Sequence, residues 1–103
     1  MIVESVCPVT EYTIYVEHCS SECYDFISNC FDCGLTIVGG RGQWLADDGI
    51  EEEDSFVVTI MSDDITMRHQ IRTFCDDYAE EYNQVQIIWS EREVHLMSRE
   101  YRK

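Results

Sequence analysis

The spacing of apolar residues is the feature that most constrains how this chain can fold. Residues 21–33 and residues 62–82 place apolar side chains every three or four positions, which predicts two amphipathic helices. The predicted buried stripes are Cys23, Phe26, Ile27, Cys30 and Phe31 in the first helix and Ile65, Ile71, Phe74, Cys75, Tyr78 and Tyr82 in the second. Asn83 is expected to end the second helix in a left-handed conformation. Four other stretches are rich in β-branched and aromatic residues, and polar residues alternate with apolar ones along them, which predicts strands. These stretches are residues 9–16, 35–45, 55–61 and 84–90, followed by a short fifth strand or edge extension at 94–98 and a frayed tail at 99–103. The alternation predicts that these strands turn inward Tyr12, Ile14, Val16, Phe56, Val58, Ile60, Val85, Ile87 and Trp89.

The predicted order is strand, helix, strand, strand, helix, strand. This βαββαβ order is typical of an α+β, ferredoxin-like fold, an antiparallel sheet with two helices on one face. A length of 103 residues fits a single domain. We place that domain at residues 1–103, with a core at about residues 9–90 and a short C-terminal extension at 91–103.

The sheet face without helices is predicted to be mixed and partly apolar. Such a face favours association, and a homodimer through the open sheet face is the simplest expectation, with a partner protein as the alternative. The predicted residues of this face are Thr13, Tyr15, Val57, Thr59, Met61, Gln86 and Ile88.

Residues 34–44 read GLTIVGGRGQW and are followed by an acidic turn and then by Ser-Phe-Val-Val at residues 55–58. This segment resembles an uncharacterised bacterial domain family with a G-L-T strand and a G-R-G-Q-W bend, followed by a hairpin and a helix. The resemblance covers roughly residues 10–90 in element order, and it implies the ferredoxin-like fold but no activity. In size and acidity alone, the chain is also similar to small viral proteins that inhibit host enzymes.

Acidic residues outnumber basic ones by 21 to 7, a formal charge of −14. Direct binding of a nucleic-acid backbone or of an anionic membrane needs a basic surface, so neither is expected. The acids gather at residues 47–54 and 76–81, which are predicted to be a hairpin tip and the outer face of the second helix. A negative surface speeds encounter with a basic partner.

We therefore predict a non-enzymatic acidic protein that inhibits a basic, nucleic-acid-handling protein. A viral anti-defence factor, such as an anti-CRISPR protein or a DNA mimic, would be its strongest form. The predicted contact residues are Asp47, Asp48, Glu51, Glu52, Glu53, Asp54, Asp76, Asp77, Glu80 and Glu81.

The glycine-rich segment before Trp44 supports an alternative function. Backbone N–H groups and a nearby cation can hold a phosphate, so this segment predicts an oligomeric binder or sensor of a small, nucleotide-like ligand. Its residues would be Gly39, Gly40, Arg41, Gly42 and Trp44. The competing interpretation is a β-bulge that turns Trp44 onto the core.

The chain has six cysteines, and Cys30 and Cys33 form a C-x-x-C pair. Thiol-dependent chemistry or zinc binding is a second alternative function, and a zinc site would use Cys19, Cys23, Cys30 and Cys33. However, Cys19, Cys23 and Cys30 recur at spacings of four and seven, the pattern of small buried residues on one helix face. We therefore expect structural thiols, with no metal and no cofactor.

No apolar run approaches the 18 residues of a membrane span. The first residues lack the basic opening and unbroken apolar stretch of a signal peptide. We expect a cytoplasmic protein, or one of the host cytoplasm if it is viral.

Overall fold

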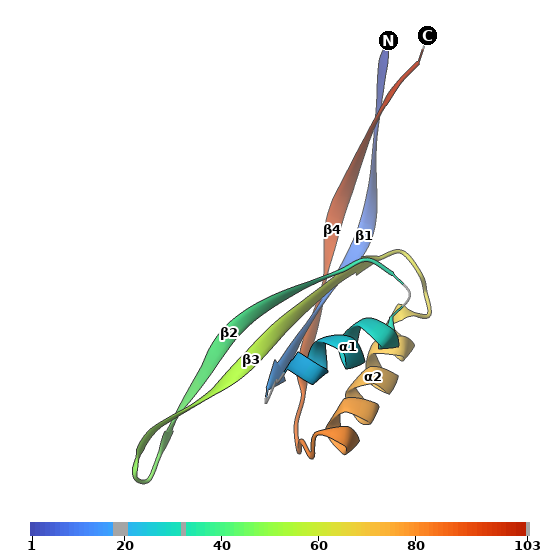
Figure 1. The fold of residues 1–103 in the computed structure, drawn as a ribbon. Helices are drawn as coiled ribbons and strands as arrows, with labels where there is room; N and C mark the ends of the chain where they lie inside the picture. Colours follow the sequence, from blue (N-terminus) through green and yellow to red (C-terminus); the bar gives the residue numbers. More distant parts are fainter. Residues whose placement is uncertain (18–20, 32, 103) are drawn as a thin grey trace.

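The computed structural model describes residues 1–17, 21–31 and 33–102, which form a four-stranded antiparallel sheet with two helices on one face (Figure 1). The strands lie in the order β2-β3-β1-β4. This arrangement confirms the predicted βαββαβ order and the α+β, ferredoxin-like fold. The elements are β1 (Ile2–Glu17), α1 (Ser21–Cys30), β2 (Leu35–Ala46), β3 (Gly49–Ser62), α2 (Met67–Glu81) and β4 (Ile88–Tyr101).

The core lies between the helices and the two central strands. Alternate residues of β1 and β3 point to one face because side chains alternate along a strand, and the apolar stripes of both helices cover that face. The buried residues from these four elements are Tyr12, Ile14, Val16, Cys23, Ile27, Phe56, Val58, Ile60, Met67, Ile71, Phe74 and Tyr78. The spacing of apolar residues in the predicted helices and strands had placed all of these residues except Met67 in the core.

Both helices are shorter than their predicted ranges. Helix α2 begins at Met67 rather than Ser62, because Asp64 accepts hydrogen bonds from the backbone and the hydroxyl of Thr66 and forms a turn there. Ile65 lies in this turn and is 97% exposed, so its assignment to the apolar stripe was wrong. Helix α1 ends at Cys30 instead of Cys33.

The end of α2 follows its predicted signal. Asn83 adopts a left-handed backbone with φ 55°, and the Gln84 N–H donates to the Ala79 carbonyl at 2.8 Å. This bond closes a Schellman motif at the helix end. Val85, in the loop that follows, is exposed, so the prediction that it points inward was wrong.

The hairpin of β2 and β3 contains neither the predicted bulge nor the predicted long acidic turn. Its register runs without interruption from the pair Leu35–Ile60 to the pair Ala46–Gly49. Only Asp47 and Asp48 form the turn, and Gly49 after them takes a φ of 130°, which favours glycine. The acids at 51–54 lie in β3 because each pairs with a residue of β2, which outweighs their low strand propensity.

The first and last strands are also longer than predicted. Strand β4 runs to Tyr101 and pairs with β1 down to Ile2, so the separate fifth strand and the frayed tail were wrong. Arg92 Nε lies 2.8 Å from Glu11 Oε1 on the neighbouring strand. This ion pair supports strand pairing through the charged residues 91–93, where the predicted strand had ended.

Two narrow arms extend from the helix-covered part of the sheet (Figure 1). Residues 41–54 pair only within β2 and β3, and we call them the hairpin arm. Residues 1–9 and 94–102 pair only with each other, and we call them the terminal ribbon. They make the molecule elongated, with extents of 66 × 26 × 23 Å.

The open face of the sheet carries the mixed surface that the alternation predicted. Val38, Val57, Tyr15 and Ile88 form a row of neighbours across all four strands, and Tyr15, Met61 and Ile88 are exposed. Association of two copies through this face stays a prediction.

Candidate functional site

A hollow of about 400 Å³ lies beside Trp44, at the base of the hairpin arm. Strand β2 contributes Gly42 and Trp44 from the glycine-rich segment. Residues from β1, β3 and the loop after α2 complete it. The lining residues are Glu17, Gly42, Gln43, Trp44, Glu53 and Gln84.

Trp44 is 44% exposed and does not pack onto the core, so the competing interpretation of the segment was wrong. Its neighbour in the chain, Gln43, donates from Nε2 to Glu52 Oε1 at 2.6 Å. The Gln84 side chain donates to the Tyr82 carbonyl at 3.1 Å, which holds it near the end of α2. The Trp44 ring and the Gln84 amide therefore lie at one hollow, whereas Glu52 holds the Gln43 side chain on the other face of the hairpin.

The glycine-rich segment does not form a phosphate cradle. Gly39 and Gly40 are ordinary strand residues paired with Phe56 and Ser55, and neither lines the hollow. Arg41 Nη1 lies 3.1 Å from Glu52 Oε2, so its positive charge is largely compensated. The sequence had placed all five candidate residues at one site, and the structure keeps only Gly42 and Trp44 there.

The chemistry of the hollow suits a flat ring without negative charge. An exposed indole offers a stacking surface for a nucleobase. The Gln84 amide can donate to and accept from the polar edge of such a base. Glu17 and Glu53 can accept hydrogen bonds from sugar hydroxyls, but as carboxylates they repel a phosphate. Sequence reasoning missed Glu17, Gln43 and Gln84, and only Gln43, beside the tryptophan, had a local signal.

The acidic residues lie on two separate elements. Those between Asp47 and Asp54 all belong to the hairpin arm, two in its turn and four in β3. Asp76, Asp77, Glu80 and Glu81 are exposed on α2. The two predicted contact clusters therefore lie on different elements, the hairpin arm and α2.

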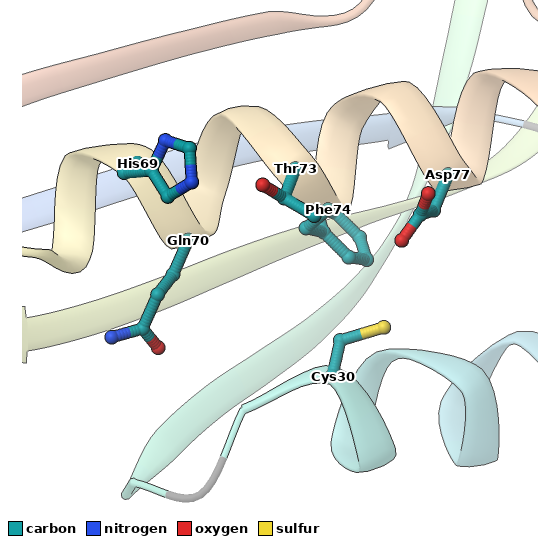
Figure 2. A pocket seen from close by; sticks show the side chains of 6 residues that line it. All are labelled: Cys30, His69, Gln70, Thr73, Phe74 and Asp77. Carbon is teal, nitrogen blue, oxygen red and sulfur yellow. The ribbon is translucent and has the colours of Figure 1, made fainter.

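Cys23, Cys30 and Cys75 lie in the two helices, whereas Cys7 is exposed on β1. Cys23 is buried in the core, with its sulfur 3.7 Å from the Tyr78 hydroxyl. Cys30 ends α1 and lines a hollow of about 210 Å³, where it faces Phe74 and Asp77 of α2 (Figure 2). Cys33 is partly buried after the helix. Cys19 lies outside the described residues, so the predicted four-cysteine zinc site is not tested as a set.

Neither Cys30 nor Cys75 has the environment of a reactive thiolate. Burial raises the pKa of the Cys30 thiol, and the negative charge of Asp77 raises it further. Burial and then Asp76 raise the pKa of Cys75 to about 11. Both effects favour the neutral thiol. Among residues 1–17, 21–31 and 33–102, no three His, Cys, Asp or Glu side chains are placed to hold a metal ion.

These pKa shifts predict alkaline destabilisation. Between about pH 9 and about pH 11 the unfolded chain loses the Cys75 proton that the folded chain keeps, so the free energy of unfolding falls as pH rises. Urea unfolding in reducing buffer across this window measures the decline. The free energy of unfolding of the Cys75→Ala variant should fall less steeply with pH. An equal pH dependence in the two proteins would contradict a raised pKa for Cys75.

In the part of the chain that the structure describes, none of the helices is long and apolar enough to cross a membrane.

Comparisons with known proteins agree with this architecture. Residues 18–97 match the family described as protein of unknown function, DUF3574. Among solved structures, a phage SAM lyase in complex with S-methyl-5'-thioadenosine is similar over 87% of this chain and 90% of its own, with a TM-score of 0.63 and 12% identity. A search of curated protein sequences found no match.

A second kind of similar structure is CPII, a nitrogen regulatory PII-like protein from Thiomonas intermedia K12. Its complex with ADP, AMP and bicarbonate aligns with a TM-score of 0.53 and 13% identity, over 89% of this chain and 98% of that chain. Its apo form aligns with a TM-score of 0.56 and 11% identity, over 93% and 99%. At these identities the likeness shows a shared fold.

Proposed function

This chain belongs to the DUF3574 family, whose matched region spans residues 18–97 and confirms the resemblance seen in the GLT…GRGQW segment. From that starting point we propose that it binds a small adenosine-containing molecule that lacks phosphate groups, and that it does so as an oligomer. The observation that carries the proposal is the hollow beside Trp44, which is lined by an exposed indole, by Gln84 and by the acidic residues Glu17 and Glu53.

The fold neighbours support the class of ligand. S-methyl-5'-thioadenosine is bound by the phage lyase, and ADP and AMP are bound by CPII. An adenosine group is common to all three molecules. In our chain the carboxylates of Glu17 and Glu53 favour a neutral or cationic adenosine compound over a phosphorylated one, which narrows the nucleotide-like ligand predicted from the sequence.

Calorimetric titration with adenosine, S-methyl-5'-thioadenosine and ADP tests the proposal. The first two should bind, and ADP should bind more weakly. The Trp44→Ala variant should lose about tenfold or more in affinity, because stacking on an aromatic ring contributes about 1–3 kcal/mol per base.

The matched control is Ile65→Ala, which shortens an exposed apolar side chain outside the hollow. Its affinity should equal that of the unmodified chain. A Trp44→Ala variant that binds adenosine as tightly as the unmodified chain would contradict an adenosine site at this position. Tighter binding of ADP than of adenosine would contradict a site that disfavours phosphate.

The proposal is binding without turnover, and mass spectrometry of recovered S-methyl-5'-thioadenosine would reveal any chemical change. The inhibition of a basic, nucleic-acid-handling protein by the acidic residues stays a prediction. The comparisons give it no support.

A further inference from the structure

The strand register sets the order in which residues line the hollow beside Trp44. Gly42 of β2 pairs with Glu53 of β3, and Glu17, the last residue of β1, pairs with Ser55. Directly paired residues share a face of the sheet, and so do alternate residues of one strand. The indole therefore lies toward the turn of the hairpin arm, and the side chains of Glu53 and then Glu17 follow toward the helix-covered part of the sheet.

The glycine at position 42 leaves the floor of the hollow open. A Cβ atom at this position would lie 3.8 Å from the carbonyl oxygen of Glu53, an ordinary contact. Gly42 is a paired strand residue, and its φ is not in the left-handed region that favours glycine. A larger side chain would therefore fit the backbone, and it would fill the space between the Trp44 indole and the Glu53 side chain.

The hollow is acidic. Glu17 and Glu53 line it, and Glu51 pairs with Trp44 on the same face. Within the part of the chain that the structure describes, no arginine or lysine lines it. Arg41 belongs to the opposite face of the hairpin, because neighbouring strand residues alternate. A ligand in the hollow therefore meets a negative potential, which favours a positive charge.

We infer that the hollow binds an adenosine compound that carries a positively charged group, such as an ammonium, on its 5′ carbon. The adenine stacks on the Trp44 indole, and the ribose lies over Gly42. The 5′ group then lies beside Glu53 and Glu17, where it donates charge-assisted hydrogen bonds. Two residues of a strand span about 7 Å, which suits the reach of a nucleoside from its base to its 5′ group. The inference rests on the proposed adenosine site and adds the sign and the place of the charge on the ligand.

Calorimetric titration with two matched nucleosides tests the sign of the charge. Adenosine has a hydroxyl on its 5′ carbon, and 5′-amino-5′-deoxyadenosine has an amine there, which is protonated at about pH 6, where carboxylates are ionised. The amine should bind about tenfold more tightly than adenosine. Equal affinities would overturn this inference and leave the adenosine site intact, whereas binding of neither nucleoside would overturn both.

Two variants that each remove one negative charge test where the ammonium lies. Glu53→Gln should reduce the preference for the amine from about tenfold to about threefold. Glu93→Gln is the matched control, because Glu93 is exposed on β4, at the opposite edge of the sheet from β2. This control should keep the full preference. The same preference in both variants would overturn the assignment of the 5′ group to this end of the hollow.

Two variants that enlarge β2 test the place of the ribose. Gly42→Val fills the floor of the hollow and should weaken the binding of both nucleosides about tenfold or more. Ala46→Val adds bulk on the same face but on the other side of Trp44, and it should bind them as the unmodified chain does. Circular dichroism checks that both variants are folded, and Gly42→Ala should weaken binding in the same direction with a smaller side chain. Unchanged affinities in the position 42 variants would overturn the proposed orientation.

Discussion

Replacement of Tyr78 by alanine should lower the free energy of unfolding by about 3–5 kcal/mol, the range for large aromatic side chains in cores. Tyr78 is fully buried at the centre of an aromatic cluster. Its ring centroid lies 5.7 Å from that of Phe74 and 4.5 Å from that of Tyr82. Its hydroxyl donates to the Glu17 carbonyl at 2.8 Å, which ties the end of β1 to α2.

Urea unfolding followed by circular dichroism measures this loss. The Tyr78→Phe variant keeps the ring and removes the hydroxyl, so it should cost about 1–2 kcal/mol and remain folded. Tyr101→Ala removes a tyrosine that is 72% exposed on the terminal ribbon and should change stability by about 0.5 kcal/mol or less. A Tyr78→Ala variant as stable as the Tyr101→Ala variant would contradict the central place of Tyr78 in the core.

Salt should stabilise the folded chain strongly. With 21 acids against 7 bases, repulsion within the compact state opposes folding. Raising NaCl from about 0.01 M to about 1 M shortens the Debye length from about 30 Å to about 3 Å, which screens this repulsion. We expect the Tm to rise by about 5–10 °C, which corresponds to about 1–2 kcal/mol in a domain of this size.

The ion pairs of the chain would have the opposite effect on the Tm, because salt weakens them. Arg92–Glu11 at 2.8 Å and Arg41–Glu52 at 3.1 Å would weaken with salt, but exposed pairs contribute only about 0–1 kcal/mol each. A Tm that falls with salt would therefore show that these pairs outweigh the net charge. A variant with Glu51→Gln, Glu53→Gln and Asp54→Asn should show a smaller rise, because it removes three charges from the hairpin arm.

Side-chain periodicity identified the core well because it is a local property. Ile14, Val58 and Phe74 were assigned inward from spacing alone, and all three are buried. The same reasoning misplaced Ile65, because the turn formed by Asp64 and Thr66 delays the start of α2. Asn83 was recognised as the residue that ends α2 because a left-handed backbone there depends mainly on the residue itself.

The candidate site was only partly visible in the sequence. The GRGQW segment drew attention to Gly42 and Trp44, which do line a hollow. Arg41 had been assigned to a phosphate, but the pairing of β2 with β3 places it against Glu52 instead. Gln84 had no signal, since it reaches the hollow through the position of α2 on the sheet.

The sequence by itself determined the order of the elements, the face that each helix buries and most of the core. These depend on residue spacing within single segments, where period and propensity act directly. The tertiary structure alone decided how far the strands extend and which side chains meet. Pairing with residues 94–101 makes residues 2–9 a strand, and pairing with β2 carries the acids of residues 51–54 into β3. The two arms and the hollow beside Trp44 follow from pairing between distant segments, whose partners are set by the whole sheet and not by local sequence.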